Sequence, residues 1–205
     1  MTSARIKQAA LAHFAHKGYE GASLADIAGE VGIKKQSIYT HFKGKDELFL
    51  ELYRDIYKLE LEFASRYFQD PAPPPVDEFL YRFLVRCRER YEQDDHTKFF
   101  LRVSFFPPPH LHEEIGKLGC QYVDTLESLL LPSLRQAVEQ GKVSPAVGIR
   151  QAAAAFAALL DGLFVEMLFG GPERSMNRLE ASWLVYWRGL RFQPSDNQPS
   201  DRNEG

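Results

Sequence analysis

Four lysines stand between residues 34 and 45 with no acidic residue among them. They are Lys34, Lys35, Lys43 and Lys45. Glutamine and lysine can pair with purine edges, a threonine methyl can pack on thymine, and tyrosine and histidine can donate to phosphate. The same short segment holds Gln36, Tyr39, Thr40 and His41. These side chains suit contact with DNA, although taken alone a run of charges more often forms a plain solvated face.

Two short helices must position this segment. The apolar residues Ile6, Ala10 and Phe14 share one face of a preceding helix, and Gly18 is expected to end it. A second helix begins at the capping-box pair Ser23 and Asp26 and ends at Gly32.

The third helix is expected from about residue 34 to residue 42, with Ile38 and Phe42 as its buried pair. Gln36 then lies two positions away, roughly 200° around the helix, and faces outward. Two helices joined by a tight glycine turn, the second of them basic, form a helix-turn-helix that lays its second helix in the DNA major groove. An alternative left open is that the Tyr39 ring is an ordinary core aromatic.

The pattern of the first 50 residues closely resembles the N-terminal DNA-binding signature of the tetracycline-repressor (TetR) family of bacterial transcriptional regulators. The matching residues are Phe14, Gly18, Tyr19, Ile27, Ala28, Val31, Gly32, Ser37, Ile38, Tyr39, His41, Phe42, Lys45 and Leu48. The resemblance implies a homodimer that reads a palindromic operator with two recognition helices. It also implies a divergent helical domain that binds a small molecule and then releases the DNA.

The same resemblance assigns roles to residues. Tyr39, His41 and Lys45 look like contacts to backbone phosphate, and Ser23 looks like a cap that also touches phosphate. Base choice is expected from the positions that vary among relatives, which are Lys35, Gln36, Ser37 and Thr40. The sequence departs from the family at Lys34, where a capping serine is common, and at Gln36, where a small residue is common. Although Lys34 is a poor cap, we expect its side chain to contact DNA.

Charge is divided unevenly along the chain. The net charge is −3 over 205 residues, but residues 1–48 carry +2 and the remainder carries −5. Cys87 and Cys120 cannot form a disulfide framework and have no metal-ligand spacing, so we expect a cytoplasmic protein with no metal and no other cofactor. The longest apolar stretch, residues 152–160, is less than half of the roughly 20 residues that span a bilayer. No membrane partner and no signal peptide are therefore expected.

The rest of the chain predicts an all-α fold. A long helix starts after Gly44, and residues 71–75 form a proline-rich linker. Further helices are expected at about 76–92, 96–106, 111–140, 148–169 and 175–192. The predicted domains are a helix-turn-helix domain at 1–48, a helical effector-binding and dimerisation domain at 49–192, and a disordered tail at 193–205.

Thirteen of the 15 phenylalanines lie beyond Leu48, and an all-α domain so rich in aromatics can leave an apolar cavity. The apolar part of this predicted pocket is Phe99, Val103, Phe105 and Phe106, within a segment expected to be buried on several sides. Its polar part is His110, Tyr122, Asp124 and Glu127. A buried Asp124 or Glu127 favours a cationic lipophilic effector, but each polar residue can equally lie on the surface.

The last two helices carry a pattern typical of a partner surface. Small residues that permit close approach include Ala154 and Ala158, and a stripe at spacings of three and four follows in Trp183, Tyr186, Trp187 and Leu190. A four-helix bundle with a symmetry mate is one interpretation. A core within one chain explains the same stripe.

These features together predict a DNA-binding regulator, most simply a repressor, that a small lipophilic effector releases from its operator. One alternative is an architectural or effector-independent DNA-binding protein, whose affinity follows salt but hardly sequence. An enzyme is disfavoured because the chain has no nucleophile elbow, Walker loop or dinucleotide fingerprint.

Overall fold

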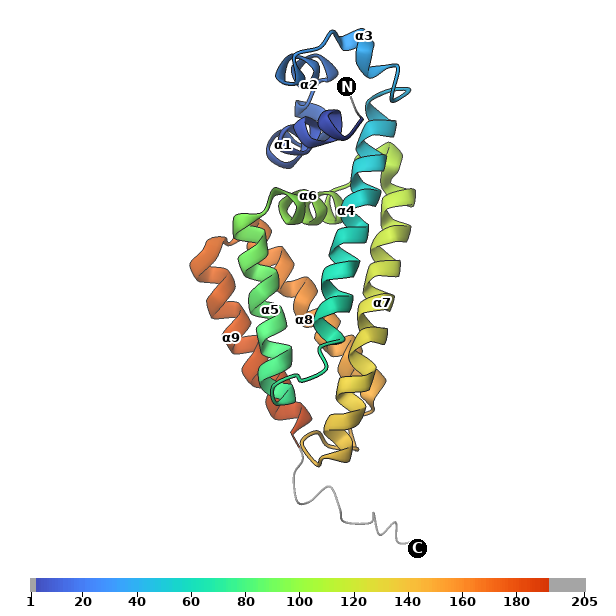
Figure 1. Ribbon diagram of the computed structural model, residues 1–205. Helices are drawn as coiled ribbons and strands as arrows, with labels where there is room; N and C mark the ends of the chain where they lie inside the picture. The colour runs from blue at the N-terminus through green and yellow to red at the C-terminus, as the bar shows by residue number, and fades with distance from the viewer. Residues whose placement is uncertain (1–2, 192–205) are drawn as a thin grey trace, which may run out of the picture. The chain divides into compact units, whose positions relative to one another are not determined.

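The computed structural model describes residues 3–191. Over that range the chain is helical and has no strand; the one isolated bridge joins Val143 and Arg191 (Figure 1). The helices are α1 (Ser3–Gly21), α2 (Leu24–Val31), α3 (Lys35–Ile38), α4 (Lys45–Phe68), α5 (Val76–Gln93), α6 (Asp95–Phe105), η1 (Pro109–Leu111), α7 (His112–Glu139), α8 (Ile149–Phe169) and α9 (Gly171–Leu190). The predicted all-α fold is confirmed. The tail predicted at 193–205 lies outside the described residues.

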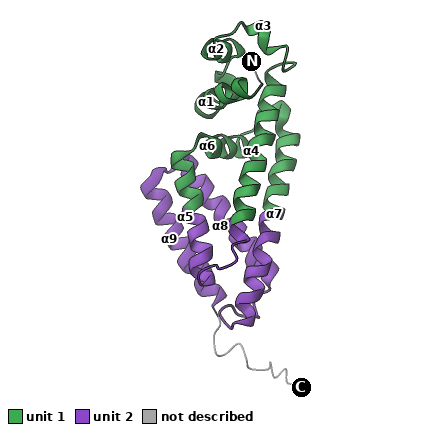
Figure 2. Ribbon diagram, viewed as in Figure 1, with its two compact units in different colours: residues 1–66, 86–124 green, residues 67–85, 125–205 purple. Residues whose placement is uncertain are grey.

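The chain forms two compact units (Figure 2). The first comprises residues 1–66 and 86–124, and the second comprises residues 67–85 and 125–205. The first unit therefore contains the helix-turn-helix together with most of α4, all of α6 and the first half of α7. A functional boundary at residue 48 is not tested by this division and stays a prediction.

Local signals form the first two helices as predicted. Gly18 interrupts α1 with φ 70° and ψ −178°, a conformation that only glycine adopts readily. Ser23 caps α2, since its hydroxyl oxygen accepts a hydrogen bond from the Asp26 amide at 3.1 Å. Gly32 ends α2 with φ 77°, and its amide donates to the carbonyls of Ala28 and Gly29.

The third helix is shorter than predicted. Regular helix covers Lys35–Ile38 rather than residues 34–42. The amides of His41 and Phe42 both donate to the Ile38 carbonyl, at 2.9 and 3.0 Å, so the chain keeps turning after the regular helix ends. Two amides on one carbonyl break the one-to-one ladder of an α-helix, and this explains the early end.

An aromatic cluster forms much of the core of the first unit. The Phe99 ring of α6 lies 5.4 Å from Phe49 of α4 and 6.2 Å from Phe14 of α1. Tyr53 stacks on Phe100 at 5.9 Å. This cluster fastens α1 to α4 and α6, and hence fixes how the helix-turn-helix sits within its unit.

Helices α8 and α9 pack on each other in the second unit. The Tyr186 hydroxyl of α9 donates to the Ala152 carbonyl of α8 at 3.0 Å. Helix α9 begins at Gly171, earlier than the predicted residue 175, because Pro172 occupies its first turn, where a missing amide is harmless.

Helix α8 alone among the helices of residues 3–191 is long and apolar enough to cross a membrane by length and composition. Of its most apolar window, 44% is buried within the protein. A core helix has the same composition, so this finding is weak evidence for a membrane span.

Candidate nucleic-acid interface

The predicted reading surface is built on an apolar anchor. Ile38 is 0% exposed and Phe42 is 1% exposed, as predicted. Lys35, Gln36 and Thr40 are exposed, while Ser37 is half-buried. The segment therefore presents its polar side chains to solvent from a fixed base.

Tyr39 belongs to this exposed surface. Its side chain is 51% exposed, which rules out the alternative that its ring is a core aromatic. His41 is exposed beside it. A phenol and an imidazole on the surface flanking a basic helix can donate to phosphate oxygens.

Two features of this segment determine which of its side-chain groups can contact DNA. The Thr40 hydroxyl donates to the Ser37 carbonyl at 2.7 Å, so its proton is already used and its methyl group is the group left for a base. Lys34 occupies the N-cap position of α3 without a side-chain cap hydrogen bond. The lysine thus leaves the helix uncapped and its own ammonium exposed, in agreement with its poor capping chemistry.

Ser23 and Lys45 lie apart from α3 in sequence. The Ser23 hydroxyl donates to the Asp26 carboxylate at 2.8 Å, and that proton is therefore not available to a phosphate in this conformation. The Lys45 ammonium lies 4.1 Å from the centre of the Tyr19 ring, a cation–π contact that holds a half-buried side chain. Contact of either residue with DNA stays a prediction.

The start of α4 is fastened to its surroundings by a small polar network. The Tyr19 hydroxyl donates to Asp46, and His110 lies 3.4 Å from the same carboxylate. The hydrogen bond from Tyr19 is the largest cause that lowers the pKa of Asp46. Burial and the Asp46 carboxylate together raise the pKa of Tyr19. Asp46 is therefore ionised at neutral pH, in the first turn of α4, where the helix dipole favours an anion.

The residues of the predicted effector pocket separate into two groups. Phe99, Val103 and Tyr122 are buried in the first unit, where Tyr122 packs on Phe100 at 5.2 Å. Phe99 belongs to the aromatic cluster that holds α1. These three side chains are buried, as part of the packed core, and a role in binding an effector stays a prediction.

The other pocket residues lie closer to the surface. Phe105 is half-buried and Phe106 is 56% exposed, so the expected burial of the whole segment is wrong at Phe106. The reason is that α6 ends at Phe105, ahead of three prolines that cannot continue it. His110 is exposed and faces Asp46.

The two acidic candidates do not form a buried pair. Asp124 is exposed in the first unit, and Glu127 is half-buried in the second. A cationic effector held by a buried Asp124 is therefore not supported.

One buried carboxylate is not among the residues predicted from the sequence: Glu60 of α4, which is 4% exposed. Arg90 of α5 donates to both of its oxygens, at 2.7 and 2.8 Å, and the Thr97 hydroxyl donates at 3.2 Å. Burial raises the pKa of Glu60 above its ordinary value, while Arg90 acts in the opposite direction. The available signal was the position of Glu60 four residues after Ile56, on the apolar face of α4.

The predicted dimer residues also fall into two groups. Ala154 and Ala158 are exposed, as a partner surface requires. Leu190 is 4% exposed inside its own unit and cannot contact a partner. The half-buried aromatics of α9 pack within the unit, Trp183 against Tyr81 at 5.5 Å and Tyr186 against Phe156 at 5.9 Å.

Trp187 is half-buried as well and stacks on Trp183 at 5.9 Å. Most of the predicted stripe therefore makes packing contacts within a single chain. The exposed apolar residues of these helices are different ones: Val165, Phe169, Leu184 and Val185. Contact of the half-buried aromatics of α9 with a second chain stays a prediction, whereas Leu190 is buried within its own unit.

Sequence models of two protein families match this chain. Residues 6–52 match the model described as bacterial regulatory proteins, tetR family, and residues 102–185 match the BetI-type transcriptional repressor C-terminal model. The chain belongs to the TetR family of bacterial transcriptional regulators.

Curated relatives and solved structures agree with this assignment. The chain is 26% identical to the regulator AcrR of Shigella flexneri over 82% of its own length and 79% of AcrR. It is 30% identical to IcaR of Staphylococcus epidermidis, a negative regulator of the biofilm operon icaADBC, over 50% of its length; the match spans about half of IcaR, 54%. The fold resembles that of the Bacillus subtilis regulator FadR, solved with stearoyl-CoA, with a TM-score of 0.68 at 15% identity over 93% of this chain and 100% of FadR.

Proposed function

We propose that this protein is a cytoplasmic transcriptional repressor that binds a palindromic DNA operator as a homodimer and is released by a small lipophilic molecule. The observation that carries the proposal is a set of exposed polar side chains held on the buried anchor of Ile38 and Phe42: Lys34, Lys35, Gln36, Tyr39, Thr40 and His41. Its side chains can read bases and hold phosphates. The family consists of transcriptional regulators, and we propose no enzymatic activity.

The exposed apolar surface of α8 and α9 supports a two-fold dimer. Seven large apolar residues of the described range are exposed, and four of them are Val165, Phe169, Leu184 and Val185. Ala154 and Ala158 lie on α8 with exposed methyl groups, which lets a partner helix approach closely. Reading two half-sites requires recognition helices about 34 to 36 Å apart, a spacing that a fixed dimer maintains.

Release by an effector is supported by the relatives. The C-terminal match is to a repressor domain, and the similar FadR structure contains stearoyl-CoA, whose acyl chain is lipophilic. An effector weakens operator binding only if it binds the DNA-incompetent state more tightly. A tight-binding effector that leaves operator affinity unchanged therefore contradicts this part of the proposal.

The test is to incubate the purified protein with fragmented DNA from its own source near physiological salt and to sequence the retained fragments. A sharply enriched palindrome supports the repressor, and the neighbouring genes indicate which ligands to try. Retention without sequence preference favours an architectural DNA-binding protein instead.

A matched pair of variants locates the contact. Replacing both Lys35 and Gln36 by alanine is expected to abolish the enrichment, because both side chains are exposed on α3. Lys58→Ala, an exposed lysine of α4, is the control and is expected to leave it intact. Equal enrichment by both variants contradicts the assignment of α3 as the reading helix.

A further inference from the structure

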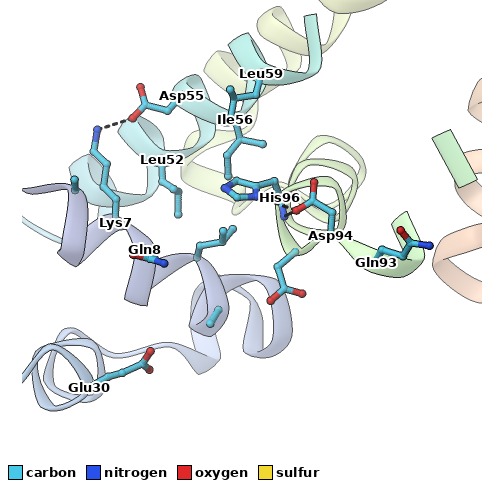
Figure 3. Close-up of a pocket in the computed structure, with 14 residues that line it drawn as sticks. Lys7, Gln8, Glu30, Leu52, Asp55, Ile56, Leu59, Gln93, Asp94 and His96 are labelled. Atoms are coloured by element: carbon cyan, nitrogen blue, oxygen red, sulfur yellow. Dashed lines mark hydrogen bonds and ion pairs between the residues drawn. The ribbon is translucent and has the colours of Figure 1, made fainter. Parts of the chain in front are cut away.

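A groove lies among α1, α2, α4 and the junction of α5 with α6 (Figure 3). None of the proposed DNA contacts lines it. All of the residues that line it belong to the first compact unit. Its volume is about 730 Å³, within the roughly 300–1,000 Å³ typical of small-molecule sites. None of the residues predicted to hold an effector lines it.

One part of the groove is apolar. Leu11 of α1 and Leu52 and Ile56 of α4 line it and are buried. Leu59, one turn further along α4, also lines it but is 44% exposed. A ligand that covered Leu59 would remove apolar surface from water, and this favours a ligand with an apolar body.

The charged side chains among the remaining lining residues are mostly acidic. Four carboxylates face the groove, those of Glu30, Asp55, Asp94 and Asp95, against the single permanent cation Lys7. An anion is therefore disfavoured and a cation is favoured, because opposite charges attract most where water is partly excluded.

The partners of these carboxylates do not remove the excess of negative charge. His13 pairs with Glu30 at 2.8 Å and His16 faces Asp95 at 3.4 Å. Asp94 lies 2.9 Å from His96 and 3.8 Å from Arg90, but the Arg90 guanidinium is already held by Glu60. The Lys7 ammonium is likewise shared between Asp55 and Glu51, so the carboxylates around the groove still outnumber the permanent cations. Lys98 also lies near Asp95, at 3.3 Å.

We propose that this groove binds a lipophilic organic cation, with its apolar body on Leu52, Ile56 and Leu59 and its charge among the surrounding carboxylates. A bare metal ion would gain nothing from contact with the apolar side chains of the groove. Among the described residues, no group of three or more His, Cys, Asp or Glu side chains is arranged to hold one.

Occupation of the groove acts on the contacts that hold α1. The Lys7 ammonium of α1 lies 2.7 Å from Asp55 of α4 (Figure 3). It also lies 2.9 Å from Glu51 of α4, so it joins the two helices. A bound cation competes with Lys7 for Asp55 and loosens this link. The consequence for DNA affinity rests on the proposed function, whereas binding of the cation does not.

The experiment uses the full chain without DNA and two probes of the same shape and opposite charge. Tetraphenylphosphonium is expected to bind with one site per chain in isothermal titration calorimetry, more weakly as salt is raised. Tetraphenylborate is expected to bind at least ten-fold more weakly. Equal affinity for both ions overturns the choice of a cation, and failure of both to bind overturns the site.

Variants on α4 locate the binding. Leu59→Lys places a positive charge on the groove wall and is expected to weaken tetraphenylphosphonium binding at least ten-fold. Because Leu59 is partly exposed, folding is expected to survive, as thermal unfolding by circular dichroism can verify. Glu62→Lys, at an exposed position on the same helix, changes the charge more and is expected to have a much smaller effect. Unchanged affinity in Leu59→Lys places the cation elsewhere and overturns the proposal.

The two proposals can fail separately. If the protein binds tetraphenylphosphonium in the groove but enriches no DNA, the proposed repressor function is contradicted and the proposed cation site is supported. If the protein enriches a palindrome but does not bind the cation, the proposed repressor function is supported and the proposed cation site is contradicted.

Discussion

Glu60 and Arg90 are a charged pair in an apolar setting. The guanidinium carbon of Arg90 lies 4.1 Å from the centre of the Phe63 ring while its nitrogens hold both oxygens of Glu60. Burying two charges costs free energy that their attraction and hydrogen bonds offset, but removing one partner leaves the other unpaired. The pair therefore couples the packing of α4 to the packing of α5.

Arg90→Met is expected to lower the free energy of unfolding by about 3 kcal/mol at pH 7.5. Without Arg90, the pKa of Glu60 rises further above its ordinary value of 4.5, so the folded state binds a proton more tightly than the unfolded state. The destabilisation is therefore smallest below about pH 4.5, grows as the pH rises and levels off above the folded pKa.

Urea unfolding at pH 5.0 and pH 7.5 checks this difference. Arg82→Met, which removes an exposed arginine paired with Glu78 on the same helix, is the control. Its effect is expected to stay below about 0.5 kcal/mol. A loss in Arg90→Met that is equal at the two pH values contradicts the role of Glu60.

Tyr39→Phe tests a single phosphate contact. Removing the exposed hydroxyl is expected to weaken operator binding about ten-fold through the loss of one hydrogen bond to a charged group. The loss is expected to be similar for all operator variants, because phosphates carry no base identity. Fluorescence anisotropy with operator mutants measures it, and a loss confined to particular bases contradicts the assignment. The melting temperature is expected to stay unchanged, since the side chain is 51% exposed.

At the scale of elements, Gly18 produces the kink inside α1. Its backbone conformation is strained for any residue with a Cβ, and the Arg102 guanidinium of α6 lies 3.4 Å from the position that a Cβ would take. Arg102 also donates to the Ala15 carbonyl at 3.4 Å. The glycine thus interrupts α1 and leaves room for Arg102 of α6 beside the backbone of this helix.

Gly18→Ala is expected to destabilise the protein by about 2 kcal/mol, mainly through backbone strain. Gly29→Ala is the matched control, because Gly29 is helical and a Cβ there meets no atom within 4 Å. That substitution is expected to stabilise α2 by about 0.5 to 1 kcal/mol. Thermal and urea unfolding measure both variants, and a loss of similar size in the two contradicts the special role of Gly18.

At the scale of the whole molecule, the proposed homodimer depends on the exposed apolar residues of α8 and α9. Val185→Glu is expected to raise the dimer dissociation constant more than ten-fold, because symmetry brings two buried carboxylates into the interface. Val185 is 73% exposed in the single chain, so folding of the protomer is expected to survive.

Light scattering after size-exclusion chromatography, over a range of protein concentrations, measures the dimer. Leu59→Glu, which changes an exposed apolar residue of α4, is the control and is expected to leave the dimer intact. A Val185→Glu protein that stays dimeric places the interface elsewhere.

The sequence by itself determined the features that depend on near neighbours. Gly18 set the kink inside α1, Gly32 and the Ser23 cap set the ends of α2, and the spacing of Ile38 and Phe42 set which face of the third segment is buried. These signals act over four residues or fewer, because backbone conformation, capping and helical period are local properties.

Tertiary structure alone decided the features that join distant residues. Glu60 and Arg90 meet across 30 positions, and His110 faces Asp46 rather than a pocket. Trp183 and Tyr186 pack inward and leave Val185 exposed. Helical periodicity shows that a helix has an apolar face, but several helices with similar faces can pair in more than one way. Only their packing against one another fixes which face forms the core of the chain and which is left for a partner or a ligand.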